Sequence, residues 1–245
     1  MSGKDEIGII LAAGKGTRMK SELPKVLHEA GGKPLVLYPV DLLRELGAKR
    51  ILVVLGHGIE QVRRVLDDSV ETVHQEPQLG TGHAVMVCAP LIEDEKGDVV
   101  VLYGDMPFLK ASTIRKLLDT HREGGFAATI LTAITDERPS YGRIVRGGDG
   151  TVLRIVEAKD ATDEELKIRE VNSGTYCFRV PDLLEALRRI SDDNAQGEYY
   201  LTDAIGILRG LGGMIGAMAM DDPDEILGVN TVEELKDIDR KLRGE

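Results

Sequence analysis

The chain has 245 residues, 42% hydrophobic and 30% charged, which suits one or two domains whose core needs no metal or disulfide. Its 31 basic and 42 acidic residues give a net charge of −11, which argues against a bulk nucleic-acid or anionic-membrane binder. Two cysteines, Cys88 and Cys177, exclude a disulfide framework and a cysteine-based zinc cluster. The longest uncharged apolar stretch, residues 210–220, is too short to span a bilayer. We expect a soluble, cytoplasmic protein with no nucleic-acid or membrane partner.

The first half of the chain alternates short apolar runs with helical patterns. Buried strands are predicted over residues 7–12, 51–55 and 99–103. Helices are predicted over residues 34–46, 59–66, 81–88 and 112–121. Pro34 suits a first helical turn and Gly47 suits the residue that ends a helix. This alternation predicts a mostly parallel α/β sheet with right-handed connections.

The second half of the chain is less regular. Strands are predicted over residues 126–134 and 171–180, with a hairpin over residues 143–156 around the turn 147–150. Helices are predicted over residues 181–190, 196–208 and 231–242. No Ser/Pro/Gly-rich linker, repeat or low-complexity tract divides the chain. We therefore expect one domain over residues 1–230, with a nucleotide-binding half over about 1–110, a substrate-binding half over about 111–230, and a C-terminal helix over 231–245.

A glycine-rich loop follows the first predicted strand, with the sequence LAAGKGTRM at residues 11–19. Backbone N–H groups of such a loop can bind phosphate. The loop does not match the dinucleotide fingerprint, because Met19 stands at the third glycine position, and this disfavours a dinucleotide oxidoreductase. No Walker A motif occurs in the chain. The glycines alone leave an ordinary strand–helix turn as an equal interpretation.

Basic residues gather around this loop. Five cations and two acidic residues lie between positions 14 and 33 of an otherwise acidic chain. The cations are Lys15, Arg18, Lys20, Lys25 and Lys33. Arginine grips phosphate oxygens through its planar fork, and lysine acts as a point charge. A solvated loop is the alternative, but the apolar neighbours of Lys25 in LPKVL (residues 23–27) favour a lysine whose stem is held in place.

Two further positions suit a phosphate-transfer site. Asp105 follows the predicted strand 99–103, at the sheet edge where open α/β folds bind ligands, and its carboxylate suits Mg²⁺. A turn aspartate is the alternative. The amide of Gln75 can pair with a donor and an acceptor on a base edge, and Gly80 permits close approach, although a plain helix start would also explain this segment. His83 alone is interpreted as a helix surface residue or a support for a ligand-contacting neighbour.

Taken together, these segments resemble the signature of the sugar-1-phosphate nucleotidylyltransferases. The ordered matches run from residue 7 to about 232 and include PKVLH (24–28), QLGTGH (78–83), YGD (103–105), YGR (141–143), NAQGEYYLTD (194–203) and GVN (228–230). Within that family the closer resemblance is to the uridylyltransferase domain of the bacterial bifunctional N-acetylglucosamine-1-phosphate uridylyltransferases/glucosamine-1-phosphate acetyltransferases. The resemblance implies a Rossmann-like nucleotidyltransferase domain, with a mostly parallel, mixed central sheet flanked by helices.

The resemblance also implies a reaction. A Mg²⁺-dependent enzyme would transfer a uridylyl group from UTP to N-acetyl-α-D-glucosamine 1-phosphate, giving pyrophosphate and UDP-N-acetylglucosamine, a cell wall precursor. Two alternatives stay open: a related enzyme that uses glucose 1-phosphate or dTTP, and a non-catalytic sugar-nucleotide sensor. Full-length relatives continue into a β-helix of hexapeptide repeats that transfers acetyl groups. This chain contains no hexapeptide repeat, so we expect no acetyltransferase domain, and we assign no oligomeric state.

Individual roles are likewise implied by the resemblance. Arg18 would hold the triphosphate, and Lys25 would neutralise charge on the reacting phosphates. Asp105 and Asn230 would hold Mg²⁺. The implied nucleotide-binding residues are Leu11, Ala12, Ala13, Gly14, Gly16, Thr17, Gln75, Gly80, Thr81 and Gly104. The implied sugar-binding residues are Tyr103, Gly142, Glu157, Asn172 and Thr202, under a closing loop at residues 194–203.

Overall fold

A mixed β-sheet runs through the middle of the computed structural model, which describes residues 6–136 and 139–245. Its strands follow the order β11-β7-β10-β6-β1-β4-β5, and β8 and β9 form a hairpin beside β10. The bounds are β1 Ile7–Ala12, β4 Arg50–Leu55, β5 Glu71–His74, β6 Asp98–Tyr103, β7 Ala128–Ile134, β8 Arg143–Arg146, β9 Val152–Val156, β10 Glu170–Arg179 and β11 Ile215–Ala219. The pairs β1–β4, β1–β6, β4–β5 and β7–β11 are parallel, whereas β10 is antiparallel to β6 and β7. The predicted mostly parallel, mixed sheet is confirmed.

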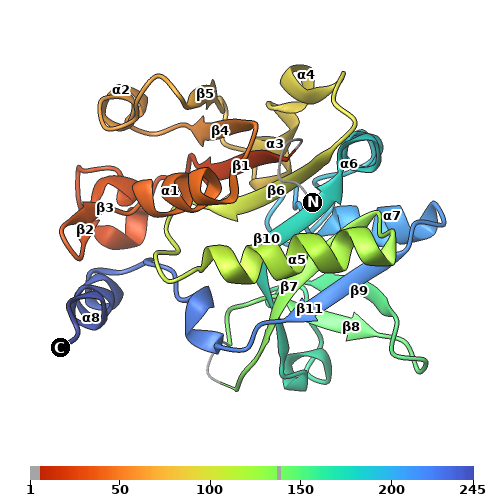
Figure 1. Cartoon of the computed structure of the whole chain (residues 1–245). Helices are drawn as coiled ribbons and strands as arrows, with labels where there is room; N and C mark the ends of the chain where they lie inside the picture. The colour runs from red at the N-terminus through yellow and green to blue at the C-terminus, as the bar shows by residue number, and fades with distance from the viewer. Residues whose placement is uncertain (1–5, 137–138) are drawn as a thin grey trace.

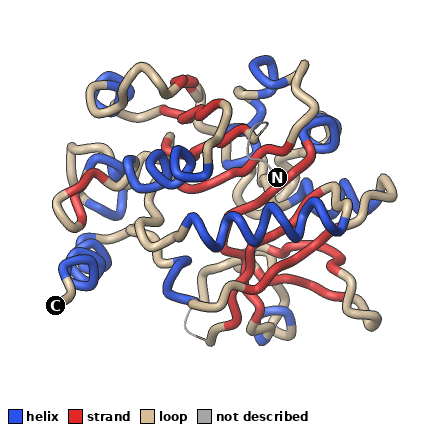
Figure 2. Tube along the Cα trace, viewed as in Figure 1, coloured by secondary structure: helices blue, strands red, loops and turns tan. Residues whose placement is uncertain are grey.

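Helices cover both faces of this sheet, as Figure 1 shows, and the strands form the layer between them in Figure 2. The bounds are α1 Leu37–Leu46, α2 Ile59–Arg63, α3 Thr81–Met86, α4 Ala89–Ile92, α5 Ala111–Gly124, α6 Val180–Leu187, α7 Asp203–Gly210 and α8 Val232–Arg243. One core packs α1, α2 and α5 against the sheet, and a second packs α3, α4, α6 and α7. Successive residues of β1 point to opposite faces, so Ile9 joins one core and Ile10 the other. This two-sided burial explains why the central strands are almost wholly apolar.

Both cysteines are buried, as expected for small hydrophobic residues. Cys88 packs in the core beneath α3 and α4, and Cys177 lies in β10 within the opposite core. Burial raises the pKa of the Cys88 thiol to about 12. A thiol with so high a pKa is a poor nucleophile at neutral pH.

Several element boundaries differ from the prediction. Pro34 is not in a helix: it pairs within a small antiparallel hairpin of β2 (Glu29–Ala30) and β3 (Lys33–Pro34), and α1 begins three residues later. The predicted helix 81–88 ends two residues early, at Met86 of α3, and a separate short helix, α4, follows it outside the predicted range. Residues 196–202 form a loop instead of the start of a helix, and α7 begins at Asp203. Gly47 does end α1 in the left-handed conformation, with φ of 78°.

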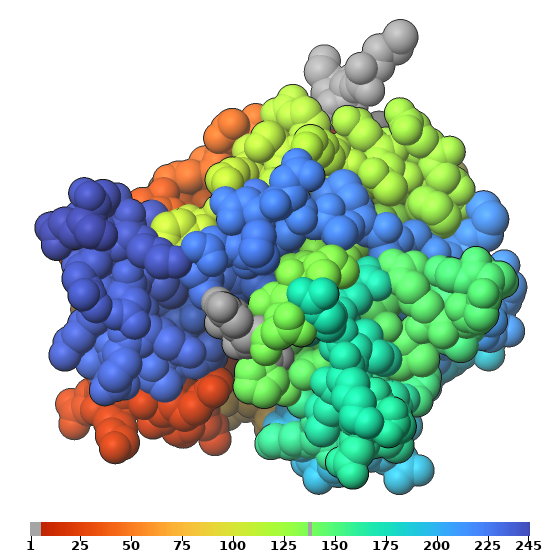
Figure 3. All heavy atoms as spheres, turned by 90° about the horizontal axis from the view of Figure 1, so that it is seen from below, coloured from red at the N-terminus to blue at the C-terminus, as the bar shows by residue number. Residues whose placement is uncertain are grey.

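The C-terminal helix α8 returns to the start of the chain. Ile238 is buried in a small core with Met19 and Leu35, and the backbone N–H of Gly31 donates to the Asp239 carboxylate at 2.8 Å. Figure 3 shows the dark blue C-terminal segment beside the red N-terminal segment. A capping box at Thr231 fixes where α8 begins. The contact holds residue 230 close to the glycine-rich loop.

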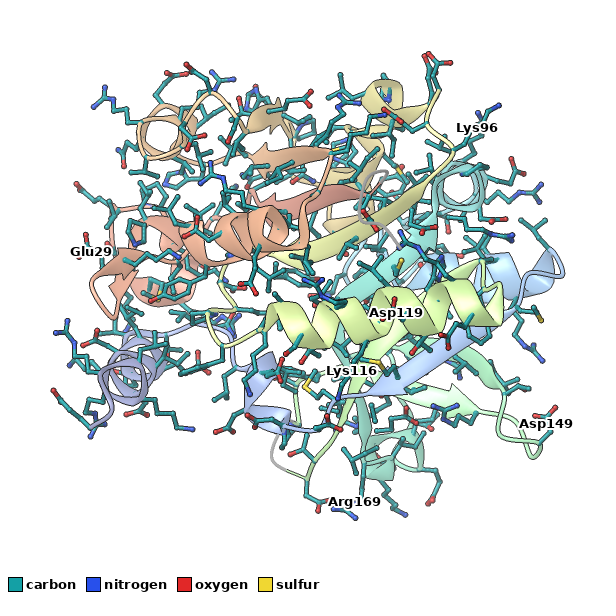
Figure 4. The ribbon with its side chains drawn as sticks, in the orientation of Figure 1. Glu29, Lys96, Lys116, Asp119, Asp149 and Arg169 are labelled. Atoms are coloured by element: carbon teal, nitrogen blue, oxygen red, sulfur yellow. The ribbon has the colours of Figure 1, made fainter. Side chains whose placement is uncertain are left out.

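Charged side chains lie mainly on the outside. Figure 4 labels Glu29, Lys96 and Arg169 among others, and these side chains project from the periphery, where each is exposed. Among the described residues, no helix combines the length and apolar character needed to cross a membrane. Residues 1–5 of the predicted domain lie outside the described residues.

An irregularity in β10 positions one predicted site residue. The pairing of β10 with β7 shifts register between Asn172 and Tyr176, and Gly174 there has a φ of 82°. The N–H of Gly174 donates to the Asn172 side chain at 3.0 Å. A Cβ at Gly174 would lie 2.2 Å from the ring of Tyr103. The bulge therefore requires glycine for two reasons, its backbone angle and the neighbouring ring.

We predict that Gly174→Ala lowers the free energy of unfolding by more than the ~1–2 kcal/mol that a left-handed φ costs by itself, because the new methyl also meets the Tyr103 ring. Gly125→Ala is the control for the angle, since its φ is 60° with open space around it. Gly148→Ala is the control for substitution alone. Urea denaturation of the three variants measures the differences. Equal losses at positions 174 and 125 would contradict the ring contact.

Candidate nucleotide and metal site

A cavity of about 480 Å³ opens where β1 and β6 end, the sheet edge at which open α/β folds bind ligands. It is lined by Leu11, Ala12, Ala13, Gly14, Lys15, Gly16, Thr17, Lys25, Val26, Gln75, Gln78, Gly80, Thr81, Ala84, Tyr103, Asp105 and Glu198. Nine of the ten predicted nucleotide-binding residues are in this lining. The tenth, Gly104, lies just behind it, where its N–H donates to the Leu11 carbonyl at 3.0 Å. The segments predicted to bind the nucleotide therefore come together around one cavity.

The glycine-rich loop is anchored at both ends. β1 leads into it, and Met19 closes it by burying its side chain in the core beside α8. Gly16 has a φ of 58°, and a Cβ there would lie 2.7 Å from the Cβ of Lys25. Glycine at position 16 thus lets the lysine stem pass against the loop. Met19, the departure from the dinucleotide fingerprint, has a structural role here as a buried anchor.

Four polar side chains from distant parts of the chain converge at the mouth of the cavity. The Lys25 ammonium forms a short ion pair with the Asp105 carboxylate and lies 3.4 Å from Oδ1 of Asn230. Arg18 donates to the same Oδ1 at 2.9 Å. Arg18 and Asn230 also line an adjacent cavity of about 400 Å³. The two predicted catalytic residues and the two predicted metal ligands are therefore in direct contact.

Side-chain amides tie the base end of the cavity together. Gln78 donates to the Ala13 carbonyl at 2.5 Å. Its side chain has room there because Gly56 has no Cβ: a Cβ at that position would lie 2.2 Å from the Gln78 amide nitrogen. Gln75 donates to the Gly80 carbonyl at 2.9 Å. Gln78 thus fastens the segment after β5 to the glycine-rich loop. The sequence analysis did not predict this tie or the place of Glu198 in the lining, because both depend on contacts between distant segments.

The predicted sugar-binding residues form a second group. Thr202 donates to Glu157 at 3.1 Å, and the backbone N–H of Asn172 donates to the Gly142 carbonyl at 2.9 Å. These four residues are absent from the cavity lining. Tyr103 is the one predicted sugar-binding residue in the lining. Burial raises the pKa of its hydroxyl, and the charges of Glu157 and Asp105 add to this shift.

The Asn172 amide is engaged within the protein. Nδ2 donates to the Tyr176 hydroxyl at 2.7 Å, and Oδ1 accepts from the Gly174 N–H. In this arrangement the side chain braces the β10 bulge. A sugar contact by Asn172 stays a prediction.

A model of the MobA-like NTP transferase domain matches residues 8–204. The chain belongs to this family. Among curated relatives, the bifunctional protein GlmU of Shouchella clausii is 49% identical over 99% of this chain, and that of Exiguobacterium sibiricum is 49% identical over 98%. The chain spans about half of each relative, 53% in both cases. These relatives confirm the predicted resemblance.

A solved structure confirms the predicted fold class. The crystal structure of a Bacillus anthracis protein, assigned as a glucose-1-phosphate thymidylyltransferase and determined with sucrose, superimposes with a TM-score of 0.79. It covers 98% of this chain and 96% of its own, at 20% identity. So low an identity supports the fold alone.

A divalent cation fits the donor set of this NTP transferase. Asp105 offers a carboxylate and Asn230 an amide oxygen, and both lie beside the Lys25 ammonium, so the two oxygens are near enough to each other to share one cation. Hard cations prefer oxygen ligands and share their coordination with phosphate and water. The described residues hold no cluster of three or more His, Cys, Asp or Glu side chains suited to a metal. A metal here would therefore complete its coordination with substrate oxygens and water.

We predict that Glu157→Gln raises the melting temperature at pH 7. Burial, ahead of the Asp203 and Asp160 charges, raises the pKa of Glu157 in the folded chain. A carboxyl whose pKa is higher in the folded chain than in the unfolded chain lowers the stability of the fold while it is ionised. This cost disappears as the pH falls from the pKa of the folded chain towards that of the unfolded chain, near 4.5. The gain should therefore shrink as the pH falls, which scanning calorimetry from pH 7 to 4 will measure.

Glu185→Gln is the matched control with the opposite sign. The hydrogen bond and charge of Arg189 lower the pKa of Glu185, so its substitution should not raise the melting temperature at pH 7. A Glu157→Gln variant that melts below the parent at pH 7 would show that the Thr202 contact outweighs burial.

Proposed function

We propose that this chain transfers a uridylyl group from UTP to N-acetyl-α-D-glucosamine 1-phosphate, releasing pyrophosphate. The observation that carries the proposal is the convergence of Arg18, Lys25, Asp105 and Asn230 at the mouth of the glycine-lined cavity. The similarity to bifunctional GlmU proteins over nearly the whole chain supports the choice of substrates.

In the proposed reaction, an oxygen of the sugar phosphate attacks the α-phosphorus of UTP. The bond from that phosphorus to the oxygen bridging to the β-phosphate breaks, and pyrophosphate leaves with the electron pair. Such a transfer depends on positioning and on stabilising charge, and needs little proton transfer by side chains. No nucleophilic Ser, Cys or His is required.

Different residues of the chain bind the phosphates, stabilise charge and hold the metal in this proposal. Backbone N–H groups of the loop around Gly14 and Gly16 bind phosphate oxygens, and Arg18 holds the triphosphate through its planar fork. Lys25 stabilises the negative charge that builds on the transferring phosphoryl group. Asp105 and Asn230 would hold Mg²⁺, which when bound supplies positive charge beside the phosphates.

Pyrophosphate release across a panel of triphosphates and sugar phosphates tests this function. UTP with N-acetylglucosamine 1-phosphate should give the highest kcat/KM. Faster turnover with dTTP or glucose 1-phosphate would reassign the substrates within the same chemistry. Tight binding of UTP with no release in any combination would instead favour a sugar-nucleotide sensor.

We expect Lys25→Ala to lower the saturated rate about a hundredfold, the effect of losing about 3 kcal/mol from one well-placed electrostatic partner. The Kd for UTP should change less, because the interaction strengthens as charge builds in the transition state. Single-turnover rates and equilibrium binding on the same variant measure both quantities. Lys33→Ala is the control, since Lys33 lies in the same basic segment and also pairs with an aspartate, Asp41, but does not line the cavity. A weakened Kd with an intact rate would make Lys25 an anchor only.

Asp105→Asn should strongly reduce turnover at moderate Mg²⁺ while the chain still folds, with a lower melting temperature because the partly buried Lys25 ammonium loses its charged partner. The amide keeps the size of the side chain but removes the negative charge that attracts the cation. A titration of Mg²⁺ should show part of the lost rate returning at high concentration. If turnover is unchanged and the melting temperature falls sharply, Asp105 is a turn residue that supports the fold.

A further inference from the structure

The Gln75 amide has a fixed orientation in the cavity. Its nitrogen lies 2.9 Å from the Gly80 carbonyl oxygen and 3.1 Å from Nδ1 of His83. A carbonyl oxygen can only accept a hydrogen bond, so the Gln75 atom that faces it must be the nitrogen. The same carbonyl accepts the Ala84 N–H at 3.1 Å, which holds it at the start of α3.

Both hydrogens of this amide nitrogen are therefore used within the protein. One goes to Gly80 and the other to His83, whose Nδ1 must act as the acceptor and whose proton is then on Nε2. Among the described residues, no hydrogen bond to Oε1 of Gln75 is found. Gln75 is buried yet lines the cavity, so the group that it can offer to a ligand is an acceptor.

From this we infer that His83 is a positioning residue for base selection: by accepting from Gln75 it keeps the amide oxygen, and not the nitrogen, available to the base. The inference deepens the proposed function, since it assumes that the base of the nucleotide reaches Gln75. Uracil carries a donor, N3–H, on its pairing edge, whereas cytosine has a bare N3 acceptor there. An acceptor from Gln75 that faces the N3 position of the base therefore suits uracil and opposes cytosine.

His83 adds to what Gly80 provides. If the amide turned over, its oxygen would face the Gly80 carbonyl, and His83 makes it face a second acceptor as well. Two acceptor–acceptor contacts oppose the inverted form more strongly than one. The His83 ring is itself held against the Tyr199 ring, with centroids 6.3 Å apart, and the Gly82 N–H donates to the Tyr199 carbonyl at 2.7 Å.

The contact with Gln75 does not distinguish UTP from dTTP. Thymine has the same N3–H as uracil, so Gln75 treats UTP and dTTP alike. Discrimination between these two must come from the space around the 5-methyl group or from the ribose.

Two variants of His83 test the inference. His83→Phe keeps a ring against Tyr199 but removes the acceptor. His83→Asn places an amide oxygen where Nδ1 stands and is the conservative rescue. For each variant and the parent, kcat/KM is measured for UTP and for CTP with the same sugar phosphate, and the Kd of each nucleotide is measured calorimetrically without it.

We expect the UTP-to-CTP ratio to fall about fivefold in His83→Phe, the effect of losing one neutral hydrogen bond. His83→Asn should restore it to within about twofold of the parent. A general loss of stability would lower kcat/KM for UTP and for CTP by the same factor and leave their ratio unchanged.

An unchanged ratio in His83→Phe, a ratio that stays low in His83→Asn, or a parent that does not prefer UTP to CTP would each overturn the inference. The Kd values test the role of His83 independently of the proposed uridylyl transfer. A parent that binds UTP better than CTP, and loses that preference in His83→Phe, supports the role of His83 even where no pyrophosphate is released.

Discussion

The ion pair between Lys25 and Asp105 is the contact on which the site depends. Its two charged groups are largely removed from water, with side chains 17% and 11% exposed, so they must lie close together to offset the cost of desolvation. Gly16 makes this possible by having no side chain where Lys25 passes. The Asp105 carbonyl accepts the Val229 N–H at 3.0 Å, which places Asn230 beside the same ammonium. One pair thus joins the segment that follows the glycine-rich loop, the end of β6 and the approach to α8.

A single segment links the base end of the cavity to the predicted sugar residues. The Tyr199 N–H donates to the Leu79 carbonyl at 2.8 Å, and the Leu201 N–H donates to the Thr81 hydroxyl at 3.1 Å. The next residue, Thr202, contacts Glu157. Gly80 has no room for a side chain, because a Cβ would lie 2.6 Å from the Tyr199 carbonyl oxygen. A displacement of this segment would therefore disturb both groups together, since its hydrogen bonds reach both.

The sequence predicted the central strands well because burial on both faces leaves near-continuous apolar runs, as in β1, β4 and β6. It missed β5 and β11, which lie at the two ends of the sheet order. β5 reads Glu-Thr-Val-His, with one apolar residue, and β11 is rich in small residues where Gly216 packs on the Phe126 ring. The contact between Arg18 and Asn230 spans 212 positions and carries no spacing signal. Only family resemblance could pair such residues before the fold was known.

The charge distribution explains how an acidic chain can suit an anionic ligand. Beyond about 8 Å, charges at physiological ionic strength are largely screened, so the net charge of −11 matters less inside the cavity than the groups that line it. There, Lys15, Lys25 and the neighbouring Arg18 gather within one loop region, the last two in contact with the oxygens of Asp105 and Asn230. A cluster of this size matches a few phosphates, whereas a nucleic acid would need a longer basic track across a surface that carries mostly the opposite charge. The same acidic surroundings that oppose a polyanion therefore leave the mouth of the cavity as the favourable place for a single triphosphate.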